Sequence, residues 1–340
     1  MPARSRRLGV TFILLAVLLG SLGACTGAGA TATPSLAPTA TTAPSASATP
    51  APTPAAAFPV TVTDDEGTAV DLPAAPQKIV SMTPATTEIL FALGAGDRIV
   101  ATDDGSDYPD AAKALPHVAT FDKVDVEKVV ALEPDLVIAG GLGFTPADSI
   151  AKLRSLKVPV VVVYAGSVEG VFKDIELLGS ATGTTEEAAT LTQGMRIDMD
   201  MVHLAVASRT PKPRVYYEIG YDDTTGAIYA PADDSFVAEM VTLAGADAIT
   251  TGEPATYQIP LETLIQRDPQ IIVLGTNPYY DPTPESVLKR TGWSAMTAVK
   301  TKDVRPVNDI EITRPGPRLP TGLRSLAAAI WPDALLPPPA

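Results

Sequence analysis

Cysteine and histidine are scarce in this sequence, and their scarcity excludes several kinds of site. Cys25 is the one cysteine among 340 residues, so no disulfide can form within the chain. The two histidines, His117 and His203, lie far apart in the sequence, whereas zinc and manganese sites usually draw on several imidazoles. We therefore expect no internal disulfide and no metal centre, and nothing in the composition indicates a cofactor.

Basic residues are also few beside acidic ones. Lys and Arg number 25 against 39 Asp and Glu, which gives a formal net charge of −14. Removing the segment before Cys25, which contains three arginines, would lower that charge by three, to −17. A nucleic acid partner is therefore not expected, since phosphate binding requires a basic face. The acidity predicts a solvated, self-repelling surface, and we expect a monomer.

The residues of a catalytic centre are missing as well. No serine lies in a nucleophile elbow, and the one cysteine, Cys25, belongs to the lipid-attachment motif described below. His117 and His203 fit surface and helix positions rather than a group of nucleophile, base and orienting acid. The sequence therefore predicts that the protein is not an enzyme.

The first feature that is present is an export signal at residues 1–25. Three arginines form a basic start, and the apolar run over 8–19 is too short to span a membrane comfortably as a mature helix. Leu22-Gly23-Ala24-Cys25 follows and resembles the bacterial lipobox, which implies cleavage before Cys25 and acylation of that residue. We expect the protein on the extracytoplasmic face of the cell membrane, held by lipid alone.

A linker is predicted at residues 26–57. This segment is almost entirely Ala, Thr, Pro, Ser and Gly and carries no charge, so it cannot bury enough apolar surface to fold. At roughly 3 Å per residue, it could hold a domain up to about 100 Å from the membrane.

From Phe58 onward, short apolar runs rich in β-branched residues alternate with helical stretches. The expected strands lie at 78–82, 136–139, 158–163, 214–219 and 271–274. The expected helices lie at 84–94, 125–132, 146–156, 167–179, 234–244 and 260–267. Continuous apolar strands separated by helices predict an α/β fold with parallel sheets covered on both faces.

One predicted helix is much longer than the others. From Glu186 to Ala207, apolar residues recur at steps of three and four, and prolines follow at 211 and 213. We interpret it as a connecting helix, within 185–209, between an N-terminal lobe at 58–184 and a C-terminal lobe at 210–340.

A sequence pattern that occurs twice, here called the echo, supports two lobes. Residues 126–138 read like residues 261–273, with a glutamate in the first helical turn and a proline seven residues later, followed by an apolar strand. The glutamates are Glu127 and Glu262. One helix-to-strand unit therefore occurs on each side of the long helix.

At this point the residues resemble a known family, the vitamin B12 and iron-siderophore binding proteins of ABC importers. The resemblance covers roughly residues 58–335. It rests on Lys78–Glu88, Ser106-Asp107-Tyr108-Pro109, the two echoes and Arg314-Pro315-Gly316-Pro317-Arg318. It implies two parallel-sheet lobes joined by one long helix, a ligand cleft between them, limited hinge motion and delivery of a small molecule to an ABC permease dimer.

The residue types and position of Thr83-Pro84 also predict that this pair lines the cleft. Threonine can cap a helix and proline can occupy its first turn, and the pair follows a strand, so it lies where open α/β sheets place their ligands. The alternative is an ordinary turn between a strand and a helix, with no role in binding.

The resemblance assigns Glu127 and Glu262 to docking on the two permease subunits, one from each lobe. Charge complementarity of this kind fixes orientation and speeds association. The alternative is that each acid favours its own helix dipole.

For the ligand, the resemblance favours cobalamin or a related corrinoid. Phe121 occupies the place of a tryptophan that packs on the corrin in many vitamin B12 binders, although Gly105 stands where some of them have an aromatic residue. In the second lobe, Tyr221 and Tyr257 are candidate contacts, with plain surface loop positions as the alternative.

Asp309 and Arg314 complete the expected site. Asp309 could accept from corrin amide groups, and Arg314 could bind a phosphate or an amide carbonyl. A ferric siderophore would favour an arginine cluster, which Arg314 and Arg318 alone do not settle, and haem would need a tyrosine ligand. A tethered surface interaction protein is a further alternative, but it leaves the echoed glutamates unexplained.

Overall fold

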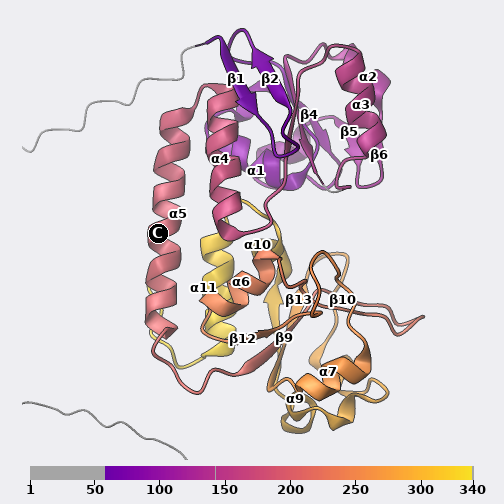
Figure 1. Cartoon of the computed structure of the whole chain (residues 1–340), viewed down its shortest axis with the longest axis vertical. Coiled ribbons are helices and arrows are strands. Elements are labelled where there is room, and N and C mark those ends of the chain that lie inside the picture. The colour runs from indigo at the N-terminus through magenta and orange to yellow at the C-terminus, as the bar shows by residue number, and fades with distance from the viewer. Residues whose placement is uncertain (1–57, 142, 339–340) are drawn as a thin grey trace, which may run out of the picture. The chain divides into compact units, whose positions relative to one another are not determined.

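The folded part of the chain contains two separate sheets in which parallel strands alternate with helices (Figure 1). The computed structural model describes residues 58–338 apart from Leu142. The predicted export signal at 1–25, with Cys25, and the predicted linker at 26–57 lie outside the described residues. The two sheets confirm the expected α/β class.

The N-terminal lobe, taken as β1 to α4, is built on a six-stranded sheet of order β6-β5-β4-β3-β7-β8. The pairs are parallel except β5 with β6. Its strands are β3 (Ile79–Ser81), β4 (Ile99–Asp103), β5 (His117–Thr120), β6 (Lys123–Val124), β7 (Leu136–Gly140) and β8 (Val160–Val163). Its α-helices are α1 (Pro84–Ala92), α2 (Val126–Ala131), α3 (Ala147–Ser155) and α4 (Val168–Thr182). A hairpin of β1 (Val60–Thr63) and β2 (Ala69–Leu72) precedes them.

The C-terminal lobe, taken as β9 to α11, has a four-stranded parallel sheet of order β12-β9-β13-β14. Its strands are β9 (Arg214–Glu218), β12 (Asp247–Ile249), β13 (Ile271–Thr276) and β14 (Val304–Asn308), with a small hairpin of β10 (Gly220–Tyr221) and β11 (Ile228–Tyr229). Its helices are α6 (Phe236–Leu243), α7 (Leu261–Arg267), α8 (Pro284–Leu288), α9 (Thr297–Thr301), α10 (Asp309–Thr313) and α11 (Leu319–Ile330).

A single helix, α5 (Thr185–Val206), connects the two lobes (Figure 1). Its 22 residues make a rod about 33 Å long at 1.5 Å per residue. It packs against α4 of the first lobe and α11 of the second. The predicted stripe is its buried face, with Ala188, Met195, Met199, Val202 and Val206 all inaccessible or nearly so. The expected helical connector is confirmed.

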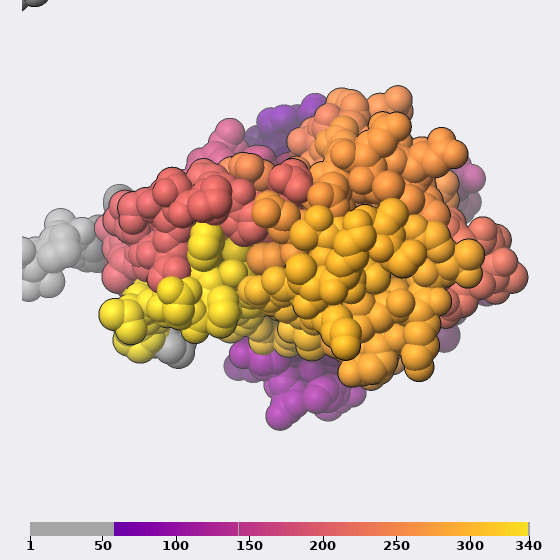
Figure 2. All heavy atoms as spheres, turned by 90° about the horizontal axis from the view of Figure 1, so that it is seen from below, coloured from indigo at the N-terminus to yellow at the C-terminus, as the bar shows by residue number. Residues whose placement is uncertain are grey.

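The main hydrophobic core is shared by both lobes. One cluster of buried side chains includes Ile138 of β7, Met199 of α5 and Val273 of β13, so it runs through the connecting helix from one sheet to the other. Two smaller clusters lie on the remaining faces of the two sheets. Seen from below, residues at the end of the chain, in yellow, lie against the rose-coloured end of α5 (Figure 2).

The helix-to-strand echo has the same local geometry in both lobes. α2 is followed by β7, and α7 is followed by β13. The residue before each proline, Glu133 or Asp268, adopts a left-handed backbone, with φ of 49° and 46°.

No helix within residues 58–338, Leu142 aside, combines the length and the apolar character needed to cross a bilayer.

Candidate functional site

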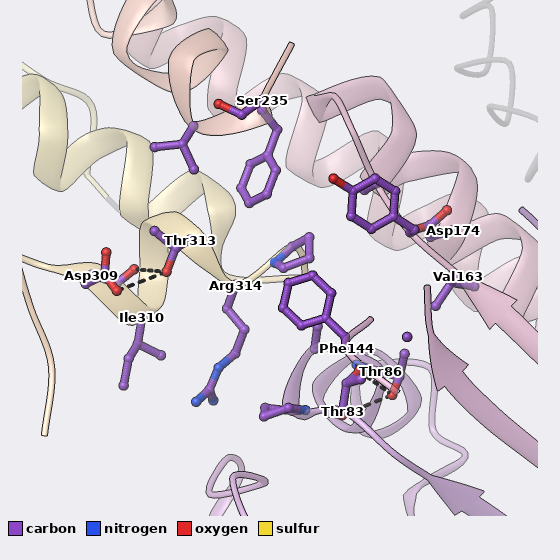
Figure 3. Close-up of a pocket in the computed structure, with 18 of the residues that line it drawn as sticks. Thr83, Thr86, Phe144, Val163, Asp174, Ser235, Asp309, Ile310, Thr313 and Arg314 are labelled. Carbon is purple, nitrogen blue, oxygen red and sulfur yellow. Dashed lines mark hydrogen bonds between the residues drawn. The ribbon is translucent and has the colours of Figure 1, made fainter. Parts of the chain in front are cut away.

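A cavity of about 590 Å³ lies between the two lobes. Much of its lining comes from segments that follow the carboxyl ends of β3, β7, β8, β13 and β14, which is where parallel α/β sheets place their ligands. Figure 3 shows Thr83, Thr86 and Phe144 of the first lobe facing Asp309, Ile310 and Thr313 of the second. The expected cleft between two lobes is therefore present.

Aromatic side chains line much of this cavity. The first lobe contributes Phe121, Phe144 and Tyr164, and the second Phe236, Tyr257 and Tyr279. Phe121 meets Phe144 edge to face with ring centroids 6.2 Å apart, and Phe144 lies 6.5 Å from Tyr164. Phe121 is 73% exposed and Tyr279 is 89% exposed, so both rings are free to pack on a ligand.

Thr83 and Pro84 line the cavity at the start of α1, as the sequence suggested. Thr83 is the N-cap of that helix and its hydroxyl accepts from the backbone N–H of Thr86 at 3.3 Å. A chain of hydroxyl groups continues inward through Thr86, Ser81 and Thr87, each 2.7–3.0 Å from the next. The cap position is thus held rigidly by buried neighbours.

Asp309 lines the opposite wall, and its carboxylate is already well supplied with donors. Tyr217 Oη donates at 2.7 Å, Thr313 Oγ1 at 3.1 Å and Asn277 Nδ2 at 3.2 Å. Burial raises the pKa of Asp309 despite these donors. A ligand would therefore meet an acid that is largely satisfied by the protein.

Arg314 also lines the cavity, but acids of the first lobe neutralise its charge. Arg314 Nη1 donates to Glu88 Oε1 and to Asp107 Oδ1, both at 2.8 Å. Arg318 joins the same carboxylate, with Nε donating to Glu88 Oε2 at 2.9 Å. The two arginines therefore tie the C-terminal lobe to Glu88 of α1.

Tyr257 and Tyr221, the two expected tyrosines, lie in different places. Tyr257 lines the cavity beside Tyr164, whose pKa is raised to about 12 by burial and then by Tyr257. Tyr221 does not line it. Its ring packs edge to face on Trp293 at 5.8 Å, with the Arg290 guanidinium 3.9 Å from its centroid. Tyr221 therefore belongs to the packing of the second lobe.

Glu127 and Glu262 lie away from the cavity lining. Each is exposed in the first turn of its helix, α2 or α7. Asp125 already caps α2 by accepting from the backbone N–H of Lys128 at 3.1 Å. Their role in docking remains a prediction.

Several lining residues were not singled out in the sequence. Phe144 follows β7, Tyr164 directly follows β8, and Tyr279 follows β13. An aromatic residue after the end of a parallel strand was the signal that could have found them. Asp174 of α4 carried no such signal. In the part of the chain that the structure describes, no three His, Cys, Asp or Glu side chains gather as they would around a metal ion.

Comparison with known proteins identifies the family. A family model described as "Periplasmic binding protein" matches residues 79–309. The chain is 34% identical over 280 residues to the uncharacterized ABC transporter substrate-binding lipoprotein YvrC of Bacillus subtilis (strain 168), covering 81% of this chain and 87% of that protein. It is 27% identical over 248 residues to the vitamin B12-binding protein of Pectobacterium carotovorum subsp. carotovorum (strain PC1), covering 72% of this chain and 85% of the relative.

Solved structures with the same fold differ in what their names say they bind. The vitamin B12 binding protein BtuF of Vibrio cholerae matches with a TM-score of 0.64 and 25% identity, covering 75% of this chain and 97% of its own. A periplasmic heme binding protein from Pseudomonas aeruginosa matches with a TM-score of 0.64 and 26% identity, covering 77% and 95%. A possible iron-binding protein from Staphylococcus epidermidis ATCC 12228 matches with a TM-score of 0.67 and 26% identity, covering 76% and 100%.

The fold agrees with those solved structures, and the family model covers both lobes. The chain therefore belongs to the periplasmic binding protein family, whose members bind small molecules for ABC importers and deliver them to the permease without catalysing a reaction.

Proposed function

We propose that this protein captures cobalamin or a related corrinoid in the cleft between its lobes and delivers it to an ABC permease. The observation that carries the proposal is a cleft with aromatic walls in which the lining cation, Arg314, is already neutralised. A corrin is a large, flat, mostly apolar ring with an amide periphery, and such a ring suits aromatic walls and uncharged hydrogen-bonding groups.

The same charges argue against the alternative ligands, a ferric siderophore and haem. Siderophore chelates are commonly acidic and haem carries two propionates, so both gain from free cations. Arg314 and Arg318 share Glu88, and the other titratable side chains that line the cleft are acids and tyrosines. One observation favours haem as the ligand: Tyr257 and Tyr279 line the cleft and could offer a phenolate to iron.

The proposed contacts are the residues that line the cleft. Phe121, Tyr257 and Tyr279 would pack on the ring, and Thr83 and Pro84 would meet its edge from the start of α1. Asp309 would accept from an amide, while Arg314 would contribute through its stem and its remaining N–H groups. Tyr221 is not proposed, because it packs on Trp293 instead.

We further propose that Cys25 is lipidated, that residues 26–57 form a tether and that the protein acts as a monomer on the extracytoplasmic face of the membrane. The similarity to a Bacillus subtilis lipoprotein supports the anchor. Glu127 and Glu262 are proposed to contact the permease.

Titration calorimetry on the full-length chain in detergent tests the ligand. We expect sub-micromolar affinity for cyanocobalamin and affinity at least about 100-fold weaker for haem and for ferric catecholate and hydroxamate siderophores. Tight binding of haem or a ferric chelate, together with no measurable binding of cyanocobalamin, would overturn the proposal. Cobinamide, which lacks the nucleotide, serves as a control that reports binding of the corrin ring alone.

A further inference from the structure

Asp174 is an acid in an otherwise apolar stripe of α4. It is 6% exposed, and the buried residues around it on the helix are Val171, Ile175 and Leu178. It also lines the cleft, and Figure 3 places it beside Val163, across the pocket from Asp309. A carboxyl group in such a position costs stability unless something donates to it.

The other buried acids of the described chain are all held by donors. Glu88 and Glu218 accept from arginine, Asp64 from Arg154 and backbone N–H groups, Asp103 from Ser106, and Asp309 from three side chains. Asp174 is the exception, since no N–H or O–H group of the other described residues donates to it, apart from its shared contact with the acid Asp65. A buried acid whose one partner among the described residues is a second acid calls for an explanation.

We propose that Asp174 contacts the captured molecule and accepts a hydrogen bond from an amide or ammonium N–H of that ligand. This inference rests on the proposed function, because it assigns the ligand chemistry of the same cleft. A ligand carboxylate, catecholate or phosphate at this place would bring a second acceptor against the first and would be disfavoured. Asp174 therefore makes the cleft select an amide periphery over an acidic one.

Within the part of the chain that the structure describes, no lysine or arginine is paired with Asp174. Asp65, from the turn between β1 and β2, lies within hydrogen-bonding reach of Asp174, and its carboxylate also accepts from the backbone N–H of Tyr164. On the elements packed against α4, Arg196 of α5 pairs with Glu169, Glu88 of α1 with two arginines, Glu239 of α6 with the Val168 N–H, and Asp64 beside β1 with Arg154. The other titratable side chains of α5 are the acids Glu186, Glu187, Asp198 and Asp200, and His203, whose ring contacts the Leu243 carbonyl.

These surroundings set the pH dependence of the contact. Burial first, and then the charge of Asp65, raise the pKa of Asp174 to about 8. At neutral pH, Asp174 thus carries a proton that it can donate to Asp65, while its second oxygen remains an acceptor. An N–H from a ligand binds the ionised form more strongly, so binding releases a proton and affinity rises as pH increases through about 8.

The test compares cyanocobalamin with its monocarboxylic acids, in which one peripheral amide has been hydrolysed, on the full-length chain in detergent. Asp174→Leu removes the acceptor and keeps the branched shape of the side chain, and Asp174→Asn keeps a neutral carbonyl acceptor. Glu169→Gln, on the exposed face of the same helix, is the control. Thermal unfolding of each variant shows whether it is folded.

We expect Asp174→Leu to weaken cyanocobalamin binding about tenfold and to reduce the preference for the amide over the acid form, while the control stays at the wild-type value. Asp174→Asn should retain most of the affinity at pH 7 and lose the rise with pH. Wild-type affinity and wild-type preference in Asp174→Leu, with the pH dependence unchanged, would exclude the contact.

Failure of the ligand assignment can be told apart from failure of this inference. If wild type binds haem or a ferric siderophore instead of corrinoids, the proposed function falls, and the same variants are titrated with that ligand. Tighter binding of the acidic ligand by Asp174→Asn than by wild type would then support Asp174 as a selector against acidic groups. Equal binding by both proteins would exclude it.

Discussion

Glu88 of α1 is 3% exposed and accepts hydrogen bonds from Arg314 and Arg318 of the other lobe. A buried carboxylate of this kind is tolerated only because it is paired, and both arginines are in turn paired with it. At the scale of the residue, Glu88 therefore joins the two lobes and also pairs with Arg314, which is then less available to bind an anion. Asp107 adds a second, half-exposed partner to Arg314.

Replacement of Glu88 tests both roles. Glu88→Gln leaves Arg318 without its carboxylate and Arg314 with Asp107 alone, so we expect a loss of about 3–5 kcal/mol in the free energy of unfolding, measured by urea denaturation. We also expect tighter binding of haem, because the freed Arg314 can meet a propionate. Asp107→Asn is the control, and removal of this more exposed partner should cost at most about 1 kcal/mol. Equal losses in the two variants would contradict the buried pairing.

Residues of the cleft could be predicted from local sequence only where they directly follow a recognisable strand. Thr83 and Pro84 follow the predicted strand at 78–82, so the topology of a parallel sheet brings them to its carboxyl edge. Asp309 follows β14, which was not predicted, and was expected in the cleft through the family resemblance. The partner of Arg314 could not be read in this way, since Glu88 lies 226 residues earlier in the chain. Asp174 escaped notice because, on a helix, a lone acid in an apolar stripe resembles a solvent-facing interruption of the pattern. Tyr221 was placed in the cleft because nothing local indicates that Trp293 covers it.

At the scale of the element, the contact between α4 and α5 depends on a glycine. A Cβ atom built on Gly179 would lie 2.4 Å from Cβ of Ala188, well inside the closest approach of two carbon atoms. The two helices are therefore nearer than any larger residue at this position would permit. Since α5 is the connection between the lobes, this packing fixes the connector against the first lobe.

Gly179→Ala should push the two helices apart. We expect a loss of about 1–3 kcal/mol in the free energy of unfolding, because extra volume in a packed interface forces a shift of backbone. Gly194→Ala on α5 is the matched change, since a Cβ there meets nothing within 4 Å. That variant should gain up to about 1 kcal/mol from higher helix propensity. Urea denaturation of both proteins measures the difference, and equal effects would rule out the close contact.

Long periodic elements were predictable, whereas short ones were not. The stripe of α5 stands out because its buried positions recur at steps of three and four, and β8 stands out as an unbroken run of four buried valines. Helices α8, α9 and α10, each of five residues, are too short to show a period, and they owe their place to packing within the second lobe. The β10–β11 hairpin likewise pairs two residues from each strand.

At the scale of the whole molecule, the two echoes place one exposed glutamate on each lobe. Glu127 begins α2 and Glu262 begins α7, and neither lines the cleft. Because α5 and a continuous core join the lobes, these two carboxylates are held on one framework with little freedom to move apart. Two charges at a fixed separation suit a permease made of two subunits, and their loss should affect delivery of the ligand rather than its capture.

The double variant Glu127→Ala with Glu262→Ala separates these two steps. We expect cyanocobalamin affinity within about twofold of wild type and uptake into cells carrying the cognate importer reduced at least about tenfold.

A general effect of removing acids from helix starts must be distinguished from docking. Glu186→Ala with Glu285→Ala provides that comparison, because these exposed glutamates also lie in the first turn of their helices, α5 and α8. Equal loss of uptake in both double variants would attribute the effect to helix dipoles or net charge. Loss of uptake in the first pair alone, with ligand binding intact, would leave contact with the permease as the explanation.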